Sequence, residues 1–184
     1  ARQFTIYNDT IYIADTYGRK VKSLTLTGQC KDVWFSSIQP HAIAANSNYV
    51  FVGYPGNGIY VLDHRLNSRT RQSINSNYLS YAWGMSINPA GNKLAIADYN
   101  KNHVVEFSIS GDWLTYTQKT SSTYSSSNGY FQRPTDTGYD SNGNIYVTDL
   151  YGHRVQKFNS TLVYQSKVGS YSTSSGFRYP YGMY

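Results

Sequence analysis

The amino-acid sequence predicts an all-β protein built from four copies of one short structural repeat. Three observations indicate this: four segments share one alternating pattern, turns rich in Asn, Asp and Gly separate the strands, and no segment shows helical periodicity over a useful length. The repeat recurs about every 45 residues, and that period with four short strands per unit is typical of a propeller blade. The predicted fold is therefore a β-propeller made of four four-stranded blades.

Each predicted blade has a central pair of strands joined by a four-residue turn. The first strand of the pair ends at Asp15, Gly53, Asp98 and Asp149, at successive spacings of 38, 45 and 51 residues. The second strand begins at Val21, Ile59, Val104 and Val155. A residue that recurs in a repeat is expected to serve its hydrogen bonding, so these aspartates, with Gly53 in the same position, are predicted to be structural. We expect each aspartate to cap turn amides or to pair with the basic residue five positions later, which is Lys20, His103 or Arg154.

One further strand precedes this pair in each blade and another follows it. The first strands are expected at 3–8, 41–46, 84–88 and about 134–139, and the last strands near 31–36, 70–75, 113–119 and 162–168. Linkers to the next blade end at Pro40, Ala82, Pro134 and Pro180. The blades then cover about 1–40, 41–82, 83–134 and 135–180 as one domain, and a strand at 181–184 starts or completes a further blade.

Composition limits the kinds of partner. The net charge of +6 arises because acidic residues are few, 10 against 16 Lys and Arg, and not because basic residues cluster. A strong electrostatic footprint for nucleic acid is therefore not indicated. No apolar run approaches the length of a membrane helix, and the single cysteine, Cys30, excludes an internal disulfide. The low charge and the high Tyr, Ser and Asn content favour an extracellular or cell-surface location, with the cytoplasm left open. Sequons at Asn8 and Asn159 permit glycosylation.

Two phrases of the repeat resemble the NHL family of β-propellers. Residues 149–158, Asp-Leu-Tyr-Gly-His-Arg-Val-Gln-Lys-Phe, are similar to the core phrase of that family, and 128–134 and 175–180 are similar to its Gly-x-Phe-x-x-Pro entry into the next blade. The third and fourth units match well and the first moderately, whereas the second departs, with Gly53 and Gly58 in place of the acidic and basic residues. The resemblance implies a ring that usually has six blades, and a function that can be binding, scaffolding or catalysis.

Four units leave the arrangement of the blades open to three interpretations. The chain is a window cut from a longer propeller, a closed four-bladed disc, or an open arc that joins other copies end to end. In the third case Asp15 of a second copy would follow Asp149 after 50 residues, within the range of the repeat. Unclosed propeller ends expose apolar faces, and a head-to-tail contact gives a ring or a filament. The expected closing or assembling residues are Gln3, Phe4, Thr5, Ile6, Tyr7, Tyr181, Gly182, Met183 and Tyr184.

One face of the predicted propeller is rich in aromatic and basic residues, because the turns inside each central pair and the linkers between blades share it. The candidate binding residues there are Tyr17, Tyr54, Tyr99, Tyr151, Trp83, Arg154, Lys101 and His103. Aromatic rings with cations can stack bases or sugars, so RNA or a glycan is an alternative partner to protein. The NHL resemblance adds that some members of the family bind single-stranded RNA on this face.

The sequence offers little support for catalysis. Some propellers related to the NHL family are metal-dependent lyases or lactonases that hold Ca²⁺ or Zn²⁺ in the channel, and such sites need several inward carboxylates or histidines. This chain has one glutamate, Glu106, scattered aspartates, four histidines and no nucleophile motif. We therefore expect no catalytic residue, metal or cofactor, and a binding or structural module that is not an enzyme and that associates with other copies of itself. A metal-dependent lyase or hydrolase is the remaining alternative.

Overall fold

The computed structural model describes residues 2–171 and 176–183, and this part of the chain contains sixteen strands in four four-stranded antiparallel sheets. Each sheet consists of four strands consecutive in sequence, so each sheet is one blade. The predicted all-β propeller fold is confirmed. Among the described residues there is no helix of the length and hydropathy needed to cross a membrane.

The strand bounds lie close to those expected. The first two blades contain β1 Gln3–Tyr7, β2 Thr10–Asp15, β3 Lys20–Thr25, β4 Cys30–Phe35, β5 Ala42–Ala45, β6 Val50–Gly53, β7 Gly58–Leu62 and β8 Ser68–Ser73. The last two contain β9 Ala82–Ile87, β10 Lys93–Asp98, β11 His103–Ser110, β12 Trp113–Lys119, β13 Pro134–Tyr139, β14 Ile145–Asp149, β15 Arg154–Phe158 and β16 Tyr164–Val168. Residues 181–183, expected as a strand, form none, and Tyr184 lies outside the described residues.

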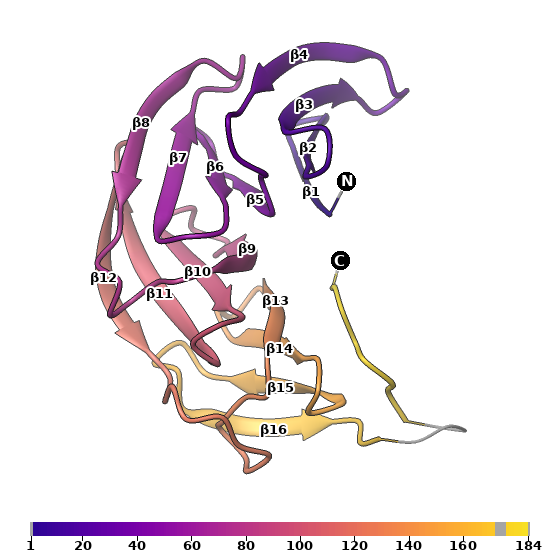
Figure 1. The fold of residues 1–184 in the computed structure, drawn as a ribbon, viewed down its shortest axis with the longest axis vertical. Coiled ribbons are helices and arrows are strands. Elements are labelled where there is room, and N and C mark those ends of the chain that lie inside the picture. The colour runs from indigo at the N-terminus through magenta and orange to yellow at the C-terminus, as the bar shows by residue number, and fades with distance from the viewer. Residues whose placement is uncertain (1, 172–175, 184) are drawn as a thin grey trace.

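The four blades stand side by side around an open arc, with β1, β5, β9 and β13 on its hollow side (Figure 1). These inner strands contact one another in order, β1 with β5, β5 with β9, and β9 with β13. The arrangement is therefore an open arc and not a closed four-bladed disc. The segment 176–183 returns towards β1 at the opening of the arc (Figure 1).

The register of the strands corrects the alignment of the second repeat by one residue. In the other blades the central pair begins with Asp15 opposite Lys20, Asp98 opposite His103 and Asp149 opposite Arg154. Gly53 instead lies opposite Ile59, which corresponds to Ala14 opposite Val21 in the first blade. Tyr54 and Gly58 therefore occupy the positions of the acidic and basic residues, and Gly53 does not.

The aspartates at this position bind turn and linker amides. Asp149 Oδ1 accepts from the Gln132 amide at 2.6 Å, and its Oδ2 accepts from Arg154 Nε at 2.9 Å. Asp98 Oδ1 accepts from the Asn100 and Lys101 amides, both at 3.0 Å. Each carboxylate therefore ties the turn between the central strands to its own blade or to the linker that enters it.

The apolar core lies between the blades. The faces of the first and second blades meet around Val21 and Val52, those of the second and third around Phe51 and Phe107, and those of the third and fourth around Phe131 and Phe158. Each of the last three blades thus presents an apolar face to the blade before it. We call this the front face of a blade, and the opposite side its trailing face.

Candidate functional site

Residues at the starts of the first three inner strands project towards the axis of the arc, Arg2 and His41 just before β1 and β5, and Trp83 as the second residue of β9. Arg2 and His41 hold equivalent places, since their amides donate to Ala14 O at 3.0 Å and to Gly53 O at 2.8 Å. Trp83 lies at the same step in the third blade, beside the Gly84–Ala97 pair. Tyr181-Gly182-Met183 repeats the pattern of Trp83-Gly84-Met85, so the C-terminal segment adds a further residue of this kind. These positions converge on one end of the axis.

The Arg2 guanidinium is the centre of this group. Its Cζ lies 3.4 Å from the centroid of the Trp83 ring, its Nη1 lies 3.0 Å from His41 Nδ1, and its Nη2 donates to the Tyr181 hydroxyl. The Trp83 ring stacks on Tyr99 with centroids 4.2 Å apart. Cation–π contacts of this kind strengthen as water is excluded. We call Arg2, His41, Tyr81, Trp83, Tyr99 and Tyr181 the mouth cluster.

The electrostatics of the mouth cluster keep His41 neutral. Burial, with a smaller effect of the nearby Arg2 charge, lowers the pKa of His41 to about 4. The neutral ring can accept from Arg2, which is always a donor. Two other nitrogens of the cluster, Arg2 Nε and Trp83 Nε1, are buried and have no hydrogen-bond partner among the described residues. A hollow of about 230 Å³ beside Arg2 is lined by Thr16, Tyr17 and Tyr181. The cluster therefore offers a cation, aromatic rings and hydrogen-bond donors next to an open space.

Five of the eight predicted binding residues have side chains at least partly accessible to solvent. Trp83 and Tyr99 belong to the mouth cluster, Tyr17 is 90% exposed beside the hollow, Tyr151 packs on Tyr179, and Lys101 is half-buried. Arg2, His41 and Tyr81 are not among the eight, and Tyr181 was expected as a closing or assembling residue. The signal that could have found Arg2 and His41 is the repeated position at the start of the inner strands.

The other three predicted binding residues are buried, and their placement corrects the prediction. Tyr54 is 4% exposed and its hydroxyl accepts from Arg71 Nε at 2.9 Å. His103 is fully buried between Tyr78 O and Ser122 Oγ. Arg154 is 3% exposed and donates to Asp149 and to three linker carbonyls. Their polar atoms are used within and between strands and linkers, so these residues do not line a face.

A layer of hydrogen bonds closes the axis below the mouth cluster. Gln3 Nε2 donates to Met85 O at 3.1 Å and to Asp136 Oδ1 at 2.9 Å, while its Oε1 accepts from the Ile43 amide at 2.8 Å. Asp136 Oδ2 accepts from the Met183 amide at 3.0 Å. Burial raises the pKa of Asp136 to about 7. One glutamine thus links the first, second, third and fourth blades.

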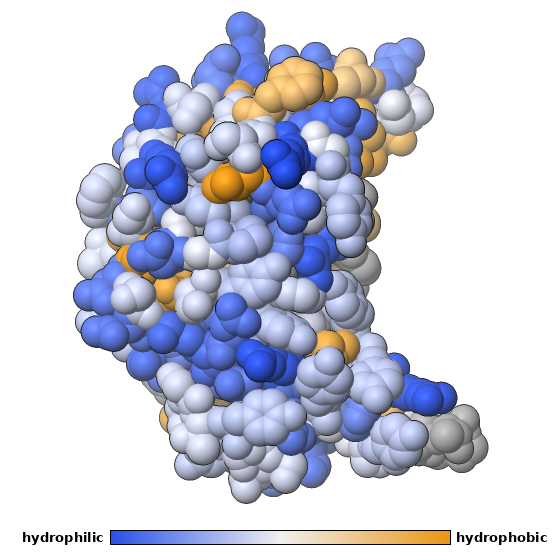
Figure 2. Space-filling model, viewed as in Figure 1, coloured by the Kyte–Doolittle hydropathy of each residue, from blue (hydrophilic) through white to orange (hydrophobic). Residues whose placement is uncertain are grey.

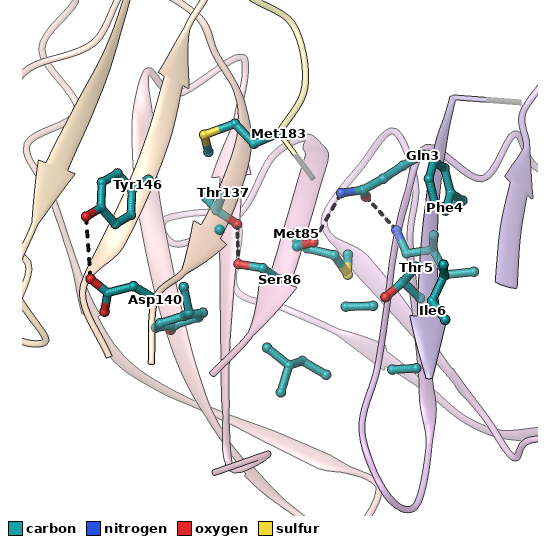
Figure 3. Close-up of a pocket in the computed structure, with 16 residues that line it drawn as sticks. Gln3, Phe4, Thr5, Ile6, Met85, Ser86, Thr137, Asp140, Tyr146 and Met183 are labelled. Atoms are coloured by element: carbon teal, nitrogen blue, oxygen red, sulfur yellow. Dashed lines mark hydrogen bonds between the residues drawn. The ribbon is translucent and has the colours of Figure 1, made fainter. Parts of the chain in front are cut away.

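A groove of about 680 Å³ runs along the inner strands beyond this layer (Figure 3). Its apolar lining includes Ile6, Ile43, Met85 and Met183. Figure 3 shows Ile6 on the strand of the first blade and Tyr146 near Asp140 on the far side, in the fourth blade. The groove therefore spans the hollow side of the arc from its first blade to its last.

The front face of the first blade is apolar and exposed. Its apolar residues are Ile6, Ile11, Ile13, Leu24, Val33 and Phe35, of which Ile6 is 55% and Phe35 76% exposed, and Lys20 and Lys22 of β3 lie on the same side. Phe4, on the same side of β1, is 38% exposed. Figure 2 shows hydrophobic atoms gathered at this end of the arc. In the described part of the chain no blade packs against this face.

The positions equivalent to Ile11, Ile13 and Leu24 are buried in the other blades, whereas Val33 and Phe35 correspond to the exposed Arg71 and Ser73 of the second blade. Ile11 and Ile13 correspond to Val50 and Val52, to Leu94 and Ile96, and to Ile145 and Val147, and each of these six residues is at most 1% exposed. Leu24 corresponds to Leu62, Phe107 and Phe158, which are also at most 1% exposed. Ile11, Ile13 and Leu24 of the first blade therefore hold positions that, in the other blades, are buried against the preceding blade.

The described residues show no arrangement of a metal site. Within 2–171 and 176–183, no group of three His, Cys, Asp or Glu side chains lies close enough to hold an ion. The exposed Cys30 lies at the start of β4, away from the axis.

Comparison with known proteins agrees with the geometry. The profile described as NHL repeat matches residues 131–158, which cover most of the fourth blade. A streptogramin B lyase structure has a TM-score of 0.74 at 12% identity, over 97% of this chain and 56% of that one. A catalytically inactive virginiamycin B lyase variant from Staphylococcus aureus, with quinupristin, has a TM-score of 0.71 at 14% identity, over 98% and 58%. Kuenenia stuttgartiensis hydrazine synthase has a TM-score of 0.67 at 15% identity, over 89% and 47%. No curated protein matches the chain.

The sheets and these similarities define the class of protein. The chain belongs to the β-propellers, and it spans somewhat more than half the length of the lyases that share its fold. An NHL repeat is matched within its fourth blade, at residues 131–158.

One expectation from the sequence is wrong. The chain was expected not to be an enzyme, yet the structures similar to it include streptogramin B lyase and virginiamycin B lyase, which are enzymes. At 12–14% identity this likeness concerns the fold alone. The repeat and the fold therefore give no ground for excluding catalysis.

Proposed function

We propose that the protein is a propeller arc that associates end to end, with the front face of its first blade docked on the trailing face of the fourth blade of a second copy. The observation that carries the proposal is the apolar face of the first blade, in which Ile11, Ile13 and Leu24 hold positions that are buried in every other blade. The kind of surface that covers those equivalents is the trailing face of another blade. A second copy offers such a face at the other end of the arc.

The trailing face of the fourth blade suits this role. Its inner part contains Gly138 and Thr148, as the buried trailing face of the second blade contains Ala44 and Gly53, and Met183 of the same copy already lies beside Gly138. Small residues there let the next blade approach closely, and a Cβ at Gly53 would overlap Ala82 and Met85 of the third blade. On the outer strand β16, Val168 is 61% exposed and can make an apolar contact with a second copy.

The energetics favour a reversible contact. Full burial of one Phe, Val or Ile side chain stabilises by roughly 1.5–3 kcal/mol, and because Ile6, Val33 and Phe35 are already partly buried they together supply less than roughly 5–9 kcal/mol. The loss of rotational and translational freedom costs about 4–15 kcal/mol. The association is therefore expected to depend on concentration, and a ring or a filament follows from the angle between copies.

Native mass by light scattering over a concentration series tests the proposal. The wild-type chain is expected to exceed the 20.8 kDa of one copy as concentration rises. The double variant Ile6→Asp/Phe35→Asp is expected to stay monomeric, because a charge on the front face must be desolvated on docking. Trp113→Asp is the matched control, since Trp113 is 55% exposed on β12 and lies outside the front face. A monomeric wild type, or equal loss of mass in the control, would contradict the proposal.

A second candidate is ligand binding at the mouth cluster, supported by the stacked Arg2, Trp83 and Tyr99 beside the 230 Å³ hollow. Such rings can stack a base or a sugar. Oligouridylate and maltoheptaose serve as probes, with tryptophan fluorescence as the readout. Tyr99→Ala and Trp83→Ala are expected to weaken binding, whereas the front-face double variant retains it. Absence of binding of either probe at millimolar concentration would count against an RNA or glycan ligand.

A further inference from the structure

A second cavity lies between the first and second blades, at the opposite ends of the strands from the mouth cluster. Its volume is about 540 Å³, and side chains from the turn after β1, from β2 and β4, and from the turn after β7 line it. The residues that matter for its chemistry are Tyr7, Tyr12, Lys31, Asp32, His64 and Arg65. The cavity is separate from the groove of about 680 Å³, whose lining comes from the inner strands, β14 and Met183.

His64 is held in one orientation at the wall of this cavity. Its ring stacks on Tyr7 with centroids 5.5 Å apart and planes at 15°, and its Nδ1 lies 2.9 Å from the Tyr12 hydroxyl. The other ring nitrogen, Nε2, is buried and has no hydrogen-bond partner among the residues that the structure describes. A buried polar atom without a partner costs free energy, which a ligand atom bonded to it would recover.

The turn that carries His64 is rigid. Asp63 Oδ1 accepts from the Arg65 and Asn67 amides, both at 2.9 Å, and Leu66 closes the turn with a positive φ of 59°. Side-chain-to-backbone bonds of this type fix a turn locally. His64 and the neighbouring Arg65 are therefore presented to the cavity by a preformed loop.

The lining of the cavity carries two cations and one carboxylate, and the charge of Asp63 also acts on Tyr12. Lys31 Nζ donates to Thr10 Oγ1 at 3.0 Å, which leaves two of its three N–H groups for another acceptor. Arg65 is exposed at the rim. The one carboxylate of the lining, Asp32, already accepts from Ser23 Oγ at 3.1 Å. Two cations and an unsatisfied histidine nitrogen beside two aromatic rings match a ring-shaped molecule that carries an anionic group.

We infer that this cavity binds a small phosphate monoester of a ring compound. The phosphate oxygens accept from Lys31, Arg65 and the Nε2–H of His64, and the ring packs against Tyr7 and Tyr12. Phosphate is preferred because it offers several acceptor oxygens and a charge near −2, which matches several N–H donors.

Phenyl phosphate is the probe, and isothermal titration calorimetry at moderate salt measures its affinity for the wild-type chain and its variants. His64→Gln and Lys31→Gln are each expected to weaken binding at least tenfold. Arg69→Gln is the matched control, because it removes a cation from the same region without touching the cavity, and it is expected to change the affinity less than twofold. Phenyl β-glucoside, which lacks the phosphate, is expected not to bind.

A histidine-selective NMR spectrum supplies the second readout. Phenyl phosphate is expected to shift the ring resonances of His64 and to leave those of His103, which is buried elsewhere, in place. Unchanged affinity in both His64→Gln and Lys31→Gln, or no binding of the probe at millimolar concentration, would overturn the inference. The front-face double variant keeps this site, so failure here and failure of end-to-end association are distinguishable.

Discussion

At the scale of single residues, the axis of the arc is governed by two polar side chains. Gln3 uses both ends of its amide to bond three other blades, and Asp136 lies buried against Gly84, where a Cβ would overlap the carboxylate. Burial in this position opposes ionisation, which is why the pKa of Asp136 rises to about 7. The hydrogen bonds of Gln3 and Asp136 at the axis therefore have strengths that depend on pH.

The first prediction concerns Asp136→Asn. A carboxyl whose pKa is about 7 in the fold and 3.8 otherwise stabilises the fold at low pH, and that contribution is lost as pH rises from about 4 to 7. The difference between these two pKa values corresponds to at most roughly 4 kcal/mol of unfolding free energy. The unfolding free energy of the variant relative to wild type is therefore expected to increase between pH 5 and pH 8, as measured by urea denaturation.

Asp140→Asn is the control for this experiment. The bonds from Asn144 lower the pKa of the exposed Asp140, so it is ionised throughout that range in the fold. The difference in unfolding free energy between Asp140→Asn and wild type is expected to stay constant over that pH range. A constant difference for Asp136→Asn as well would show that Asp136 ionises freely at the axis.

At the scale of elements, the sequence predicted the strands well and the side chains at the axis poorly. The ends of the central strands at Asp15, Asp98 and Asp149 were found because a residue pattern with period two and a recurrent acidic cap are local signals. The mouth cluster was only partly predicted, through Trp83 and Tyr99, because Arg2, His41, Trp83 and Tyr181 share a position and not a residue type. Only the register of the sheets shows that such positions are equivalent.

The second blade illustrates the same limit. Its turn is one residue shorter, so Tyr54 fills the place of the aspartate, and Gly58 is small because the tyrosine ring lies there. An alignment made from the sequence alone puts Gly53, and not Tyr54, at the position of the aspartate. Shape complementarity between Tyr54 and Gly58 replaces the ionic pairing of the fourth blade, where Arg154 binds Asp149.

The second prediction tests this replacement. Gly58→Lys is expected to destabilise the fold by about 2–4 kcal/mol, because its Cβ would overlap the Tyr54 hydroxyl. The double variant Tyr54→Asp/Gly58→Lys restores the acidic and basic pair and is expected to recover part of that loss. Chemical denaturation of the two single variants and the double variant gives the coupling energy. If the double variant loses as much unfolding free energy as the two single variants lose together, this account is contradicted.

At the scale of the whole molecule, the blades differ in how many neighbours they have. The third blade packs on both sides, and all but one residue of β10 is buried. The first blade packs only on the second, and the outer strand β4 contains no buried residue. Stability is thus expected to decrease from the middle of the arc to its ends, as in other proteins built by stacking repeated units.

The third prediction follows from this gradient, and hydrogen–deuterium exchange measures it. In a dilute sample the amides of β10 and β11 are expected to exchange most slowly, and those of β1 and β2 much faster, because the front face of the first blade is open to water. If copies associate end to end, raising the concentration closes that face, and the exchange of β1 and β2 slows towards that of the inner blades. The amides of β10 supply the internal control, since their burial is already complete in one copy. Equal exchange of β1 and β2 at all concentrations would instead mean that the front face stays exposed, and that whatever covers it is not another copy of this chain.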